Sequence, residues 1–470
     1  LSLRIILIKS FIVSHIVRNF TKKWILEKKK IVILGAGFAG LKLARKLNNN
    51  PHFSVTLIDR YNYHQFQPLF YQVATAAINA SDISFPIRKV FQGSKNVSVR
   101  LAEVTAINKD KNTVETTIGD FAYDHLVVAM GCTTNFFGNK QIEELSFPMK
   151  STNEALTLKN RLLTNFESAY SAESPEEMEE IMNIVVVGGG PTGVELSGAI
   201  AQMKKFILPK DYPDLDFSKL NIFLIEGSPN LLGPMSDLAH KKSKEYLTDL
   251  GVNVWTEGRV TDYDGKTISL ADGRTIKTRN LIWAAGVMGN IPEGVVTKEE
   301  LQRGFRIKVD RTSKVEGSNN IYAIGDISYM ETPKYPHGHP QLARVAGDQA
   351  VNLAKNFEKI GEGTKEENLS LFEYSDPGSM ATVGKRKAVV DLPKFSFSGR
   401  LAWYTWMFLH LMLILTVRNK LAIFLNWAQT YFTNDSSLRI IVRPTKKDFR
   451  FNLKQYRRFP KNRDKEVEQA

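Results

Sequence analysis

Cysteine is almost absent from this chain. Cys132 is the single cysteine among 470 residues, so no disulfide can form within one chain. A redox centre built from two thiols is excluded for the same reason, because such a centre needs a second reactive cysteine. A lone thiol is typical of a protein from a reducing compartment.

Acidic residues are missing from residues 1–26, and basic residues gather at both ends of the chain. Residues 1–30 carry eight Lys/Arg and one Glu, and residues 391–470 carry 15 Lys/Arg and six acids, in a chain of net charge +14. Both basic blocks adjoin apolar stretches. This arrangement favours an anionic membrane surface over a nucleic acid, since nucleic-acid binders usually carry their charge beside the working site.

The first 28 residues do not begin with Met and are left out of the predicted fold. They mix basic residues with Ile, Leu and Phe, as an organellar presequence or a membrane-surface helix does. The alternative is a translated upstream stretch or an unanchored tail. The two interpretations stay open.

No apolar run in the sequence is long enough to span a bilayer comfortably. Leu401 to Val417 carries no charged residue but is slightly short, and Leu421 to Phe432 is shorter and interrupted by amides. Aromatic residues at one end and a basic tail predict two helices lying in the membrane interface; a dimer interface or core helices are the alternative. His410 is expected to be packed rather than functional. Without a bundle of spanning helices, no path for ion pumping is expected.

Glycine, by contrast, stands directly after buried strands. Ile31 to Leu34 run into Gly35-Ala36-Gly37-Phe38-Ala39-Gly40, and a stretch of helical pattern follows. The first glycine permits the turn, the second admits a pyrophosphate, and the third lets the helix pack on the strand. The next strand ends in Asp59, whose carboxylate can accept both ribose hydroxyls of an adenosine. A dinucleotide site is predicted; the alternative is a glycine-rich turn of an ordinary α/β domain.

The same pattern is repeated in the middle of the chain. A buried strand, Ile184 to Val187, precedes Gly188-Gly189-Gly190-Pro191-Thr192-Gly193, and the strand after it ends in Glu226. A carboxylate at that place would repel a 2′-phosphate, and Gly227 rather than Arg follows it. The second ligand should therefore be NADH and not NADPH.

Two such units predict an α/β fold with two Rossmann-like dinucleotide-binding domains, the second inserted into the first. Strands that end in Gly131 and Gly286 mark where the chain leaves the first domain and where it returns to it. A strand over 320–324 places Asp326 on a turn beside the first pyrophosphate. Residues 151–180 are expected to form a helix and then an acidic link. The predicted divisions are a leader (1–28), a first nucleotide domain (29–145 and 286–390), an inserted nucleotide domain (146–285) and a C-terminal membrane-association region (391–470).

Taken together, these motifs resemble those of the type II, non-proton-pumping NADH:quinone oxidoreductases. The resemblance covers nearly all of residues 29–445 and includes His64–Thr75, Gly188–Glu195, Gly338–Arg344 and the two C-terminal apolar runs. It implies non-covalent FAD on the first unit, NADH on the second, and two C-terminal helices docked on a membrane. Menaquinone or ubiquinone would accept the electrons, no metal would take part, and the protein would be a homodimer. The implied location is peripheral, on the cytoplasmic face of a bacterial inner membrane, or on an organellar inner membrane if the leader is a presequence.

The resemblance also assigns roles to residues. Glu195 would lie near the flavin–nicotinamide contact, where a carboxylate can relay protons, although its spacing alone is equally consistent with helix-dipole complementation. Gln341 and Arg344 would complete the catalytic set. The FAD contacts implied are Gly35, Gly37, Phe38, Ala39, Gly40, Asp59, Arg60, Gln72, Val104, Gly131, Asp326, Leu342 and Ala343. The NADH contacts implied are Gly188, Gly190, Thr192, Gly193, Glu226 and Gly286. By pattern alone, the aromatic and amide-rich stretch 64–75 is either a wall facing a planar ring or a buried loop.

One position departs from the family pattern. Arg344 stands where a glutamine is expected beside the quinone, and Asp348 follows one helical turn later, within reach of an ion pair. Charge and bulk there should slow quinone turnover, so Arg344→Gln is expected to raise quinone reductase activity.

Other classes of protein remain to be separated. The alternative to the enzyme is a membrane-docked NADH-binding flavoprotein sensor, or a related reductase with impaired quinone turnover. Disulfide reductases and sulfide:quinone oxidoreductases are excluded by the lone Cys132. A soluble ferredoxin or peroxide reductase would have no use for the apolar C-terminal region.

Overall fold

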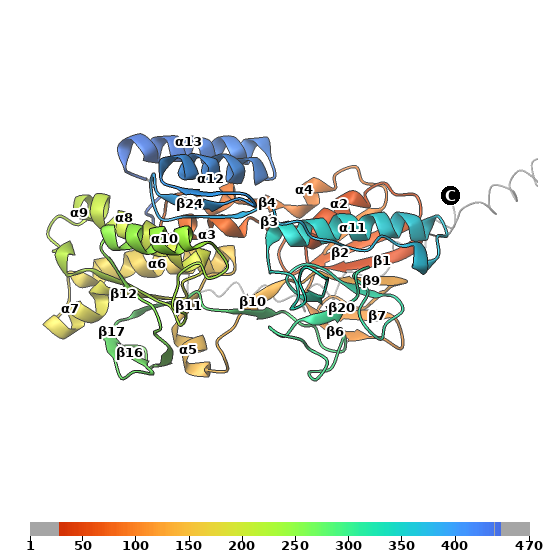
Figure 1. Ribbon diagram of the computed structural model, residues 1–470, viewed down its shortest axis with the longest axis horizontal. Coiled ribbons are helices and arrows are strands. Elements are labelled where there is room, and N and C mark those ends of the chain that lie inside the picture. Colours follow the sequence, from red (N-terminus) through yellow and green to blue (C-terminus); the bar gives the residue numbers. More distant parts are fainter. Residues whose placement is uncertain (1–27, 437, 443–470) are drawn as a thin grey trace, which may run out of the picture.

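Two five-stranded parallel sheets form the frame of the molecule, one in each nucleotide unit (Figure 1). The structure is a computed structural model and describes residues 28–436 and 438–442. Almost all of the predicted leader and most of the basic tail lie outside these residues. Parallel neighbours in a sheet need a crossover connection, and helices supply the connections that pack against these two sheets. The predicted fold class, a mixed α/β protein with two Rossmann-like units, is confirmed.

The first sheet has the strand order β21-β9-β1-β2-β5. Its strands are β1 (Lys29–Leu34), β2 (Phe53–Asp59), β5 (Val97–Leu101), β9 (His125–Val128) and β21 (Ile321–Ala323). Helices α2 (Phe38–Lys46) and α11 (Ala343–Gly361) pack on each other and share a core with β1 and β2. The late helix α11 therefore completes a unit that begins some three hundred residues earlier.

The second sheet repeats this plan with the order β11-β18-β12-β13-β14. Its strands are β11 (Phe147–Pro148), β12 (Asn183–Val187), β13 (Asn221–Ile225), β14 (Val252–Trp255) and β18 (Asn280–Trp283). Its helices are α6 (Thr152–Ala169), α7 (Pro175–Met182), α8 (Pro191–Phe206), α9 (Leu208–Asp211) and α10 (Asp237–Asp249). The acidic link expected before residue 180 is in fact mostly the helix α7. Ser174 accepts a hydrogen bond from the Glu177 N–H, and Pro175 occupies the first turn, so this segment has a complete helix start.

Short elements connect the two units and add small sheets to them. The antiparallel pair β10 (Cys132–Thr134) and β19 (Val287–Gly289) forms the two crossings, and each unit carries a small antiparallel sheet. These sheets are β6 (Val104–Asn108), β7 (Thr113–Thr116) and β8 (Phe121–Ala122) in the first unit, and β15 (Val260–Tyr263), β16 (Thr267–Leu270) and β17 (Thr275–Lys277) in the second. The remaining elements are β3 (Tyr63–Gln65), α3 (Phe70–Ala74), β4 (Ser84–Pro86), α4 (Ile87–Val90), α5 (Lys140–Leu145), β20 (Ile307–Val309) and β22 (Ser328–Met330).

The C-terminal region forms a third layer over the second unit (Figure 1). It consists of the antiparallel strands β23 (Ser379–Thr382), β24 (Ala388–Asp391) and β25 (Ser396–Ser398), followed by α12 (Arg400–Leu413) and α13 (Val417–Thr433). The division predicted at residue 391 would cut this sheet at the end of β24. The three strands are hydrogen-bonded to one another, so the layer begins with β23.

The two C-terminal helices begin and end at places that the apolar pattern did not predict. The first apolar run spans Leu401 to Val417, but α12 ends at Leu413 and Val417 is the first residue of α13. The reason is Thr416, whose side chain accepts a hydrogen bond from the Asn419 N–H and so starts the second helix. His410 is packed, as predicted: its ring stacks on Trp406 with centroids 3.9 Å apart. Among the described helices, none combines the length and the apolar character needed to cross a bilayer.

Candidate functional site

The first glycine loop has the shape that a pyrophosphate needs. Gly35 adopts a φ of +97°, and a side chain there would run into the carbonyl of Ala129. A side chain at Gly40 would run into the carbonyl of Gly35, so only glycine lets α2 lie this close to β1. Gly37, in contrast, has open space where a Cβ would stand. The loop is therefore close-packed underneath and open above the N-terminus of α2, which fits a phosphate group.

Asp59 holds this loop at the end of β2. Its carboxylate accepts hydrogen bonds from the Ala36 N–H at 2.6 Å and from the Tyr61 N–H at 2.6 Å. Burial raises the pKa of Asp59, and these two N–H groups act against that rise. The neighbouring Arg60 is exposed, with its guanidinium 5.0 Å from the Tyr61 ring. Ala102 donates its N–H to the Asp59 carbonyl, which brings the start of β6, with Val104, to this end of the sheet.

The stretch 64–75 proves to be buried. His64 is paired through Nδ1 with the carbonyl of Ala36 at 3.0 Å, and its ring meets Phe38 edge-on with centroids 5.4 Å apart. Burial lowers the pKa of His64, so the ring is neutral and supports the glycine loop. Further along, Tyr71 and Gln72 are also buried, but they line a cavity. The buried-loop interpretation therefore fits His64, and the wall facing a planar ring stays a prediction for Tyr71 and Gln72.

Asp326 lies on a turn where three parts of the chain meet. Its backbone carbonyl accepts a hydrogen bond from Gln341 Nε2 at 3.0 Å, and its carboxylate accepts one from Cys132 Sγ at 3.1 Å. Gly325, just before it, packs against α2, because a Cβ there would stand 3.2 Å from that of Ala39. The predicted residues Gly131, Asp326 and Gln341 are thus brought to the same edge of the first sheet.

Helix α11 begins beside this turn with free backbone donors. Leu342, its N-cap residue, provides no side-chain hydrogen bond, so the first N–H groups, from Ala343 onward, are open to an anion. Gln349, which the sequence analysis did not single out, is buried in this helix and accepts the Gly325 N–H at 2.7 Å. An amide between apolar residues of the buried helix face, next to Ala346 and Ala350, was the signal for it.

The second glycine loop is built in the same way. Glu226 accepts hydrogen bonds from the Gly189 N–H at 2.5 Å and from the Ser228 N–H at 2.7 Å. Gly188 adopts a φ of +113° against Ala284, and a side chain at Gly193 would run into the Gly188 carbonyl. The remaining predicted contacts lie around this opening: Gly190 is the N-cap of α8, Thr192 is exposed in its first turn, and Gly286 has a φ of +73°. Each unit therefore carries a carboxylate-braced loop open at a helix N-terminus.

A separate cavity of about 140 Å³ lies between α8 and the C-terminal layer. Glu195 points into it from α8, is only 7% exposed, and accepts the Thr382 N–H at 3.3 Å. Gly198, one turn later, permits this close approach, because a Cβ there would stand 2.8 Å from the Val383 carbonyl oxygen. The aromatic walls of the cavity are Tyr71, Phe206, Trp403, Trp406, Trp427 and Tyr431.

Burial decides the charge of this carboxyl. It raises the pKa of Glu195 to about 8, so the group is mostly protonated at neutral pH. The Thr382 N–H and the nearby Trp406 indole favour the charged form but do not overcome the burial. Trp406 Nε1 makes no full hydrogen bond to any residue that the structure describes. Burial and the Glu195 charge together raise the pKa of Tyr71.

A chain of hydrogen bonds ties the C-terminal helices to this cavity. Trp427 Nε1 donates to Gln72 Oε1 at 2.7 Å, and Gln72 Nε2 donates to Tyr71 Oη at 2.9 Å. Tyr71 Oη lies 3.2 Å from Thr382 Oγ1. Gln72 therefore anchors α13, while its predicted FAD contact stays a prediction. Trp427 lines the cavity and is a residue that the sequence analysis missed.

Arg344 and Gln341 do not share the cavity with Glu195. The predicted ion pair of Arg344 with Asp348 is confirmed, with Nε and Oδ2 2.7 Å apart, and the Arg344 side chain is 64% exposed. Gln341 instead supports the Asp326 turn. The residues predicted as one catalytic set are thus divided between two places. Within the described ranges, no cluster of His, Cys, Asp and Glu is suited to a metal ion.

Comparison with known protein families gives two matches along the chain. The family of pyridine nucleotide-disulphide oxidoreductases matches residues 29–350, and the NDH2 C-terminal domain family matches residues 377–434. The second match coincides with the layer of β23 to α13.

Individual proteins resemble the chain over most of its length. A type II NADH:quinone oxidoreductase of Mycobacterium tuberculosis is 33% identical over 418 residues, which cover 87% of this chain and 89% of that protein. A type II NADH:quinone oxidoreductase of Staphylococcus aureus is 30% identical over 379 residues, which cover 77% of this chain and 89% of that protein.

Solved structures show the same fold at lower identity. NDH2 from Plasmodium falciparum, in complex with NADH, superposes with a TM-score of 0.80 at 22% identity and covers 89% of this chain and 100% of that chain. The sulfide:quinone oxidoreductase of Aquifex aeolicus superposes with a TM-score of 0.64 at 20% identity, covering 88% of this chain and 96% of that chain.

Proposed function

The chain belongs to the pyridine nucleotide-disulphide oxidoreductases and, among them, to the type II NADH:quinone oxidoreductases, and from this premise we propose that it oxidises NADH and reduces a membrane quinone through a bound FAD. The observation that carries the proposal is the pairing of two braced nucleotide loops with an aromatic cavity around a protonated carboxyl. Bound FAD would supply hydride acceptance from the nicotinamide and electron transfer to the quinone, and the protein would supply binding, orientation and protons. Lacking a second cysteine, the chain uses no dithiol.

The first unit has the groups that FAD requires. We assign the pyrophosphate to the open loop at Gly37 and the adenosine ribose to Asp59, which lies at the end of the neighbouring strand. Asp326 and the free N–H groups at the start of α11 fit the ribityl and flavin end. Gln341 and Gln349 hold that turn in place from two sides.

The second unit is suited to NADH. The loop from Gly188 to Gly193 takes the pyrophosphate, and Glu226 takes the ribose hydroxyls. A 2′-phosphate would meet the Glu226 carboxylate, and no arginine follows it to compensate. Preference for NADH over NADPH follows.

Glu195 supplies a proton on the quinone side in this proposal. Reduction of a quinone to a quinol consumes two electrons and two protons, and a carboxyl with a pKa of about 8 holds a proton at neutral pH. Tyr71 lines the same cavity, and its hydroxyl is held in place by Gln72 Nε2, which donates to it. The aromatic walls exclude water and suit a planar ring.

The C-terminal helices are proposed to dock on the membrane. They expose large apolar side chains: Leu401, Tyr404, Phe408, Met412, Leu413, Val417, Leu421, Phe424, Leu425 and Phe432. A surface of this size on helices too short to span favours a place in the interface. For the membrane face and the oligomeric state, we keep what the resemblance implies. These are the cytoplasmic face in a bacterium and a homodimer.

Anaerobic stopped-flow spectroscopy tests the function. The purified protein should be yellow with one FAD, NADH should bleach the flavin, and a menaquinone or ubiquinone analogue should restore its colour over many turnovers. A flavin that NADH reduces but no quinone reoxidises would favour the alternative, a membrane-docked sensor. A colourless chain that takes up no FAD would contradict both.

A further inference from the structure

We propose that the turn between β23 and β24 binds the phosphate headgroup of one anionic phospholipid. The proposal rests on the membrane docking proposed above and adds to it a defined lipid site. It concerns a second cavity, which shares Lys385, Tyr431 and Asn434 with the one that Glu195 lines.

This second cavity has a volume of about 450 Å³ and is bordered by three consecutive cations of the turn and by the end of α13. The residues that matter for a headgroup are Lys385, Arg386, Lys387, Tyr431, Phe432 and Asn434. A basic wall and an apolar edge thus meet in one place.

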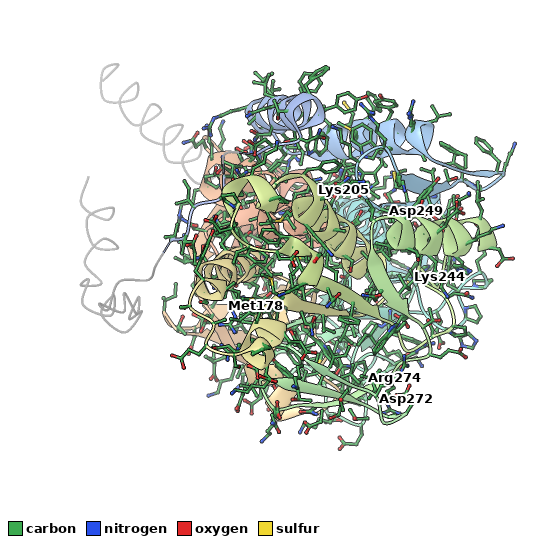
Figure 2. The ribbon with its side chains drawn as sticks, turned by 90° about the vertical axis from the view of Figure 1, so that its left-hand side faces the viewer. Met178, Lys205, Lys244, Asp249, Asp272 and Arg274 are labelled. Carbon is green, nitrogen blue, oxygen red and sulfur yellow. The ribbon has the colours of Figure 1, made fainter. Side chains whose placement is uncertain are left out.

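Two of the three cations are engaged in holding the turn. Lys385 donates to the Tyr431 carbonyl and to Asn434 Oδ1, the latter at 2.6 Å, and so closes the C-terminus of α13. Lys387 forms an ion pair with Asp249 at 3.0 Å. Figure 2 shows Asp249 and Lys205 on the side of the second unit that faces the C-terminal helices, with Asp272 and Arg274 at the opposite side.

Arg386 is left without a carboxylate partner in the described part of the chain. Its guanidinium lies 4.6 Å from the centroid of the Tyr431 ring, and its backbone has a φ of +64°, which is unfavourable for a residue with a side chain. A guanidinium presents paired N–H donors that match two phosphate oxygens. The turn therefore presents an exposed guanidinium, placed against Tyr431 and without a carboxylate partner among the described residues, beside two fixed positive charges.

The neighbouring surface indicates that the phosphate belongs to a lipid. Phe432, which borders the same cavity, is 81% exposed, and the exposed apolar residues of α12 and α13 continue from it. Figure 1 places these helices above β24, on the outer side of the molecule. A soluble phosphate would gain nothing from this apolar edge, whereas acyl chains next to the headgroup would cover it.

The test compares vesicle binding of the full-length, FAD-loaded protein and two variants. Arg386→Gln removes the exposed guanidinium, and Lys394→Gln is the matched control. Lys394 is an exposed cation in the turn between β24 and β25, at the other end of the same small sheet. Vesicles of pure phosphatidylcholine are compared with vesicles of equal parts phosphatidylcholine and phosphatidylglycerol, by co-sedimentation at physiological salt. Retention of flavin absorbance confirms that both variants fold.

A defined site predicts unequal losses. Each basic residue near an anionic surface contributes about 1 kcal/mol, so Lys394→Gln should weaken binding to the anionic vesicles about fivefold at most. Arg386→Gln should weaken it by more than about tenfold, because charge-assisted hydrogen bonds are lost as well. Binding to pure phosphatidylcholine should be unchanged in both variants.

Four results would overturn the site. Equal losses in the two variants would mean diffuse surface charge, and equal binding of the unmodified protein to both vesicles would mean that no anionic headgroup is recognised. Release of the protein from anionic vesicles by millimolar glycerol phosphate would mean a soluble ligand. Absence of binding to either vesicle would contradict the docking proposal itself, and is thereby distinguishable from failure of the lipid site alone.

Discussion

Replacement of Glu195 by glutamine is the change that examines the proposed chemistry most directly. Glutamine keeps the size of the side chain and can still accept the Thr382 N–H, but it cannot deliver a proton. Burial raises the pKa of Glu195 from 4.5 to about 8, which corresponds to a free-energy cost of charging of roughly 5 kcal/mol. A group with this pKa changes its charge within the range in which the enzyme can be assayed.

The expected kinetic result separates two half-reactions. Loss of a positioned general acid typically slows a proton-coupled step by about 10² to 10⁴. Reoxidation of the reduced flavin by a quinone should therefore slow by at least about 100-fold in Glu195→Gln, while reduction by NADH should change little. In the unmodified protein, the rate of quinone reduction should fall above pH 8 as Glu195 ionises, and this limb should be missing from the variant.

Stability gives a second readout that does not depend on turnover. Between pH 4.5 and about 8 the folded protein holds a proton on Glu195 that the unfolded chain has released. Because the folded state binds more protons, the free energy of unfolding decreases as the pH rises through this window. Glu195→Gln should remove this decrease, so its melting temperature should exceed that of the unmodified protein at pH 9 and match it more closely at pH 5.

The assay is anaerobic stopped-flow absorbance at the flavin band over pH 5.5 to 9.5, together with thermal unfolding at the same pH values. Glu176→Gln, an exposed carboxylate in the first turn of α7, is the matched control and should behave like the unmodified protein. A Glu195→Gln variant with an unaltered pH profile for quinone reduction would refute the role of this carboxyl. An unaltered pH dependence of unfolding would refute the raised pKa.

Three further outcomes follow from the geometry. Glu226→Gln should reduce the preference for NADH over NADPH, measured as the ratio of the two kcat/KM values, and an unchanged ratio would remove the role of this carboxylate. Arg344→Gln should change quinone turnover by less than about twofold. Its ion pair with Asp348 is exposed, contributes only about 0–1 kcal/mol and lies outside the cavity. A large increase in turnover would instead support the expectation drawn from the sequence. His125 is half-buried, and both of its ring nitrogens are buried without a hydrogen bond among described residues. Burial lowers its pKa to about 4, so the free energy of unfolding should fall between pH 6.5 and 4 by up to roughly 3 kcal/mol. The free energy of unfolding, measured by chemical denaturation, should fall less between pH 6.5 and 4 in His125→Phe than in the unmodified protein. An equal fall in both proteins would contradict this.

The nucleotide loops could be predicted from the sequence because the residues that form each loop are neighbours in the chain. Gly35 to Gly40 and Gly188 to Gly193 must turn, admit a phosphate and start a helix within six residues. A side chain at the first or last glycine of either loop would run into a neighbouring carbonyl. Asp59 and Glu226 follow at strand ends that the apolar pattern marks. In each case strand, loop and acid are neighbours in one βαβ unit.

Helix boundaries were harder to predict from the sequence where a single side chain decides them. Ser174 and Thr416 each start a helix by accepting a backbone N–H three residues later. A composition rich in acids, or an apolar run that continues across the boundary, hides such a start. A helix cap is a single hydrogen bond, so its signal in the sequence is weak compared with patterns that extend over many residues.

By itself, the sequence determined the two-unit fold, the pair of dinucleotide loops, the exclusion of dithiol chemistry and the apolar C-terminal helices. Only the tertiary structure decided where Glu195 lies and what it can do. Its partner Thr382 is 187 residues away in the chain and comes close because Gly198 lets β23 lie against α8. Burial there, and not residue type or spacing, keeps the carboxyl protonated, since desolvation is a property of everything that surrounds a group. The same packing separates Arg344 and Gln341 from the cavity, although the motif order had placed all three together.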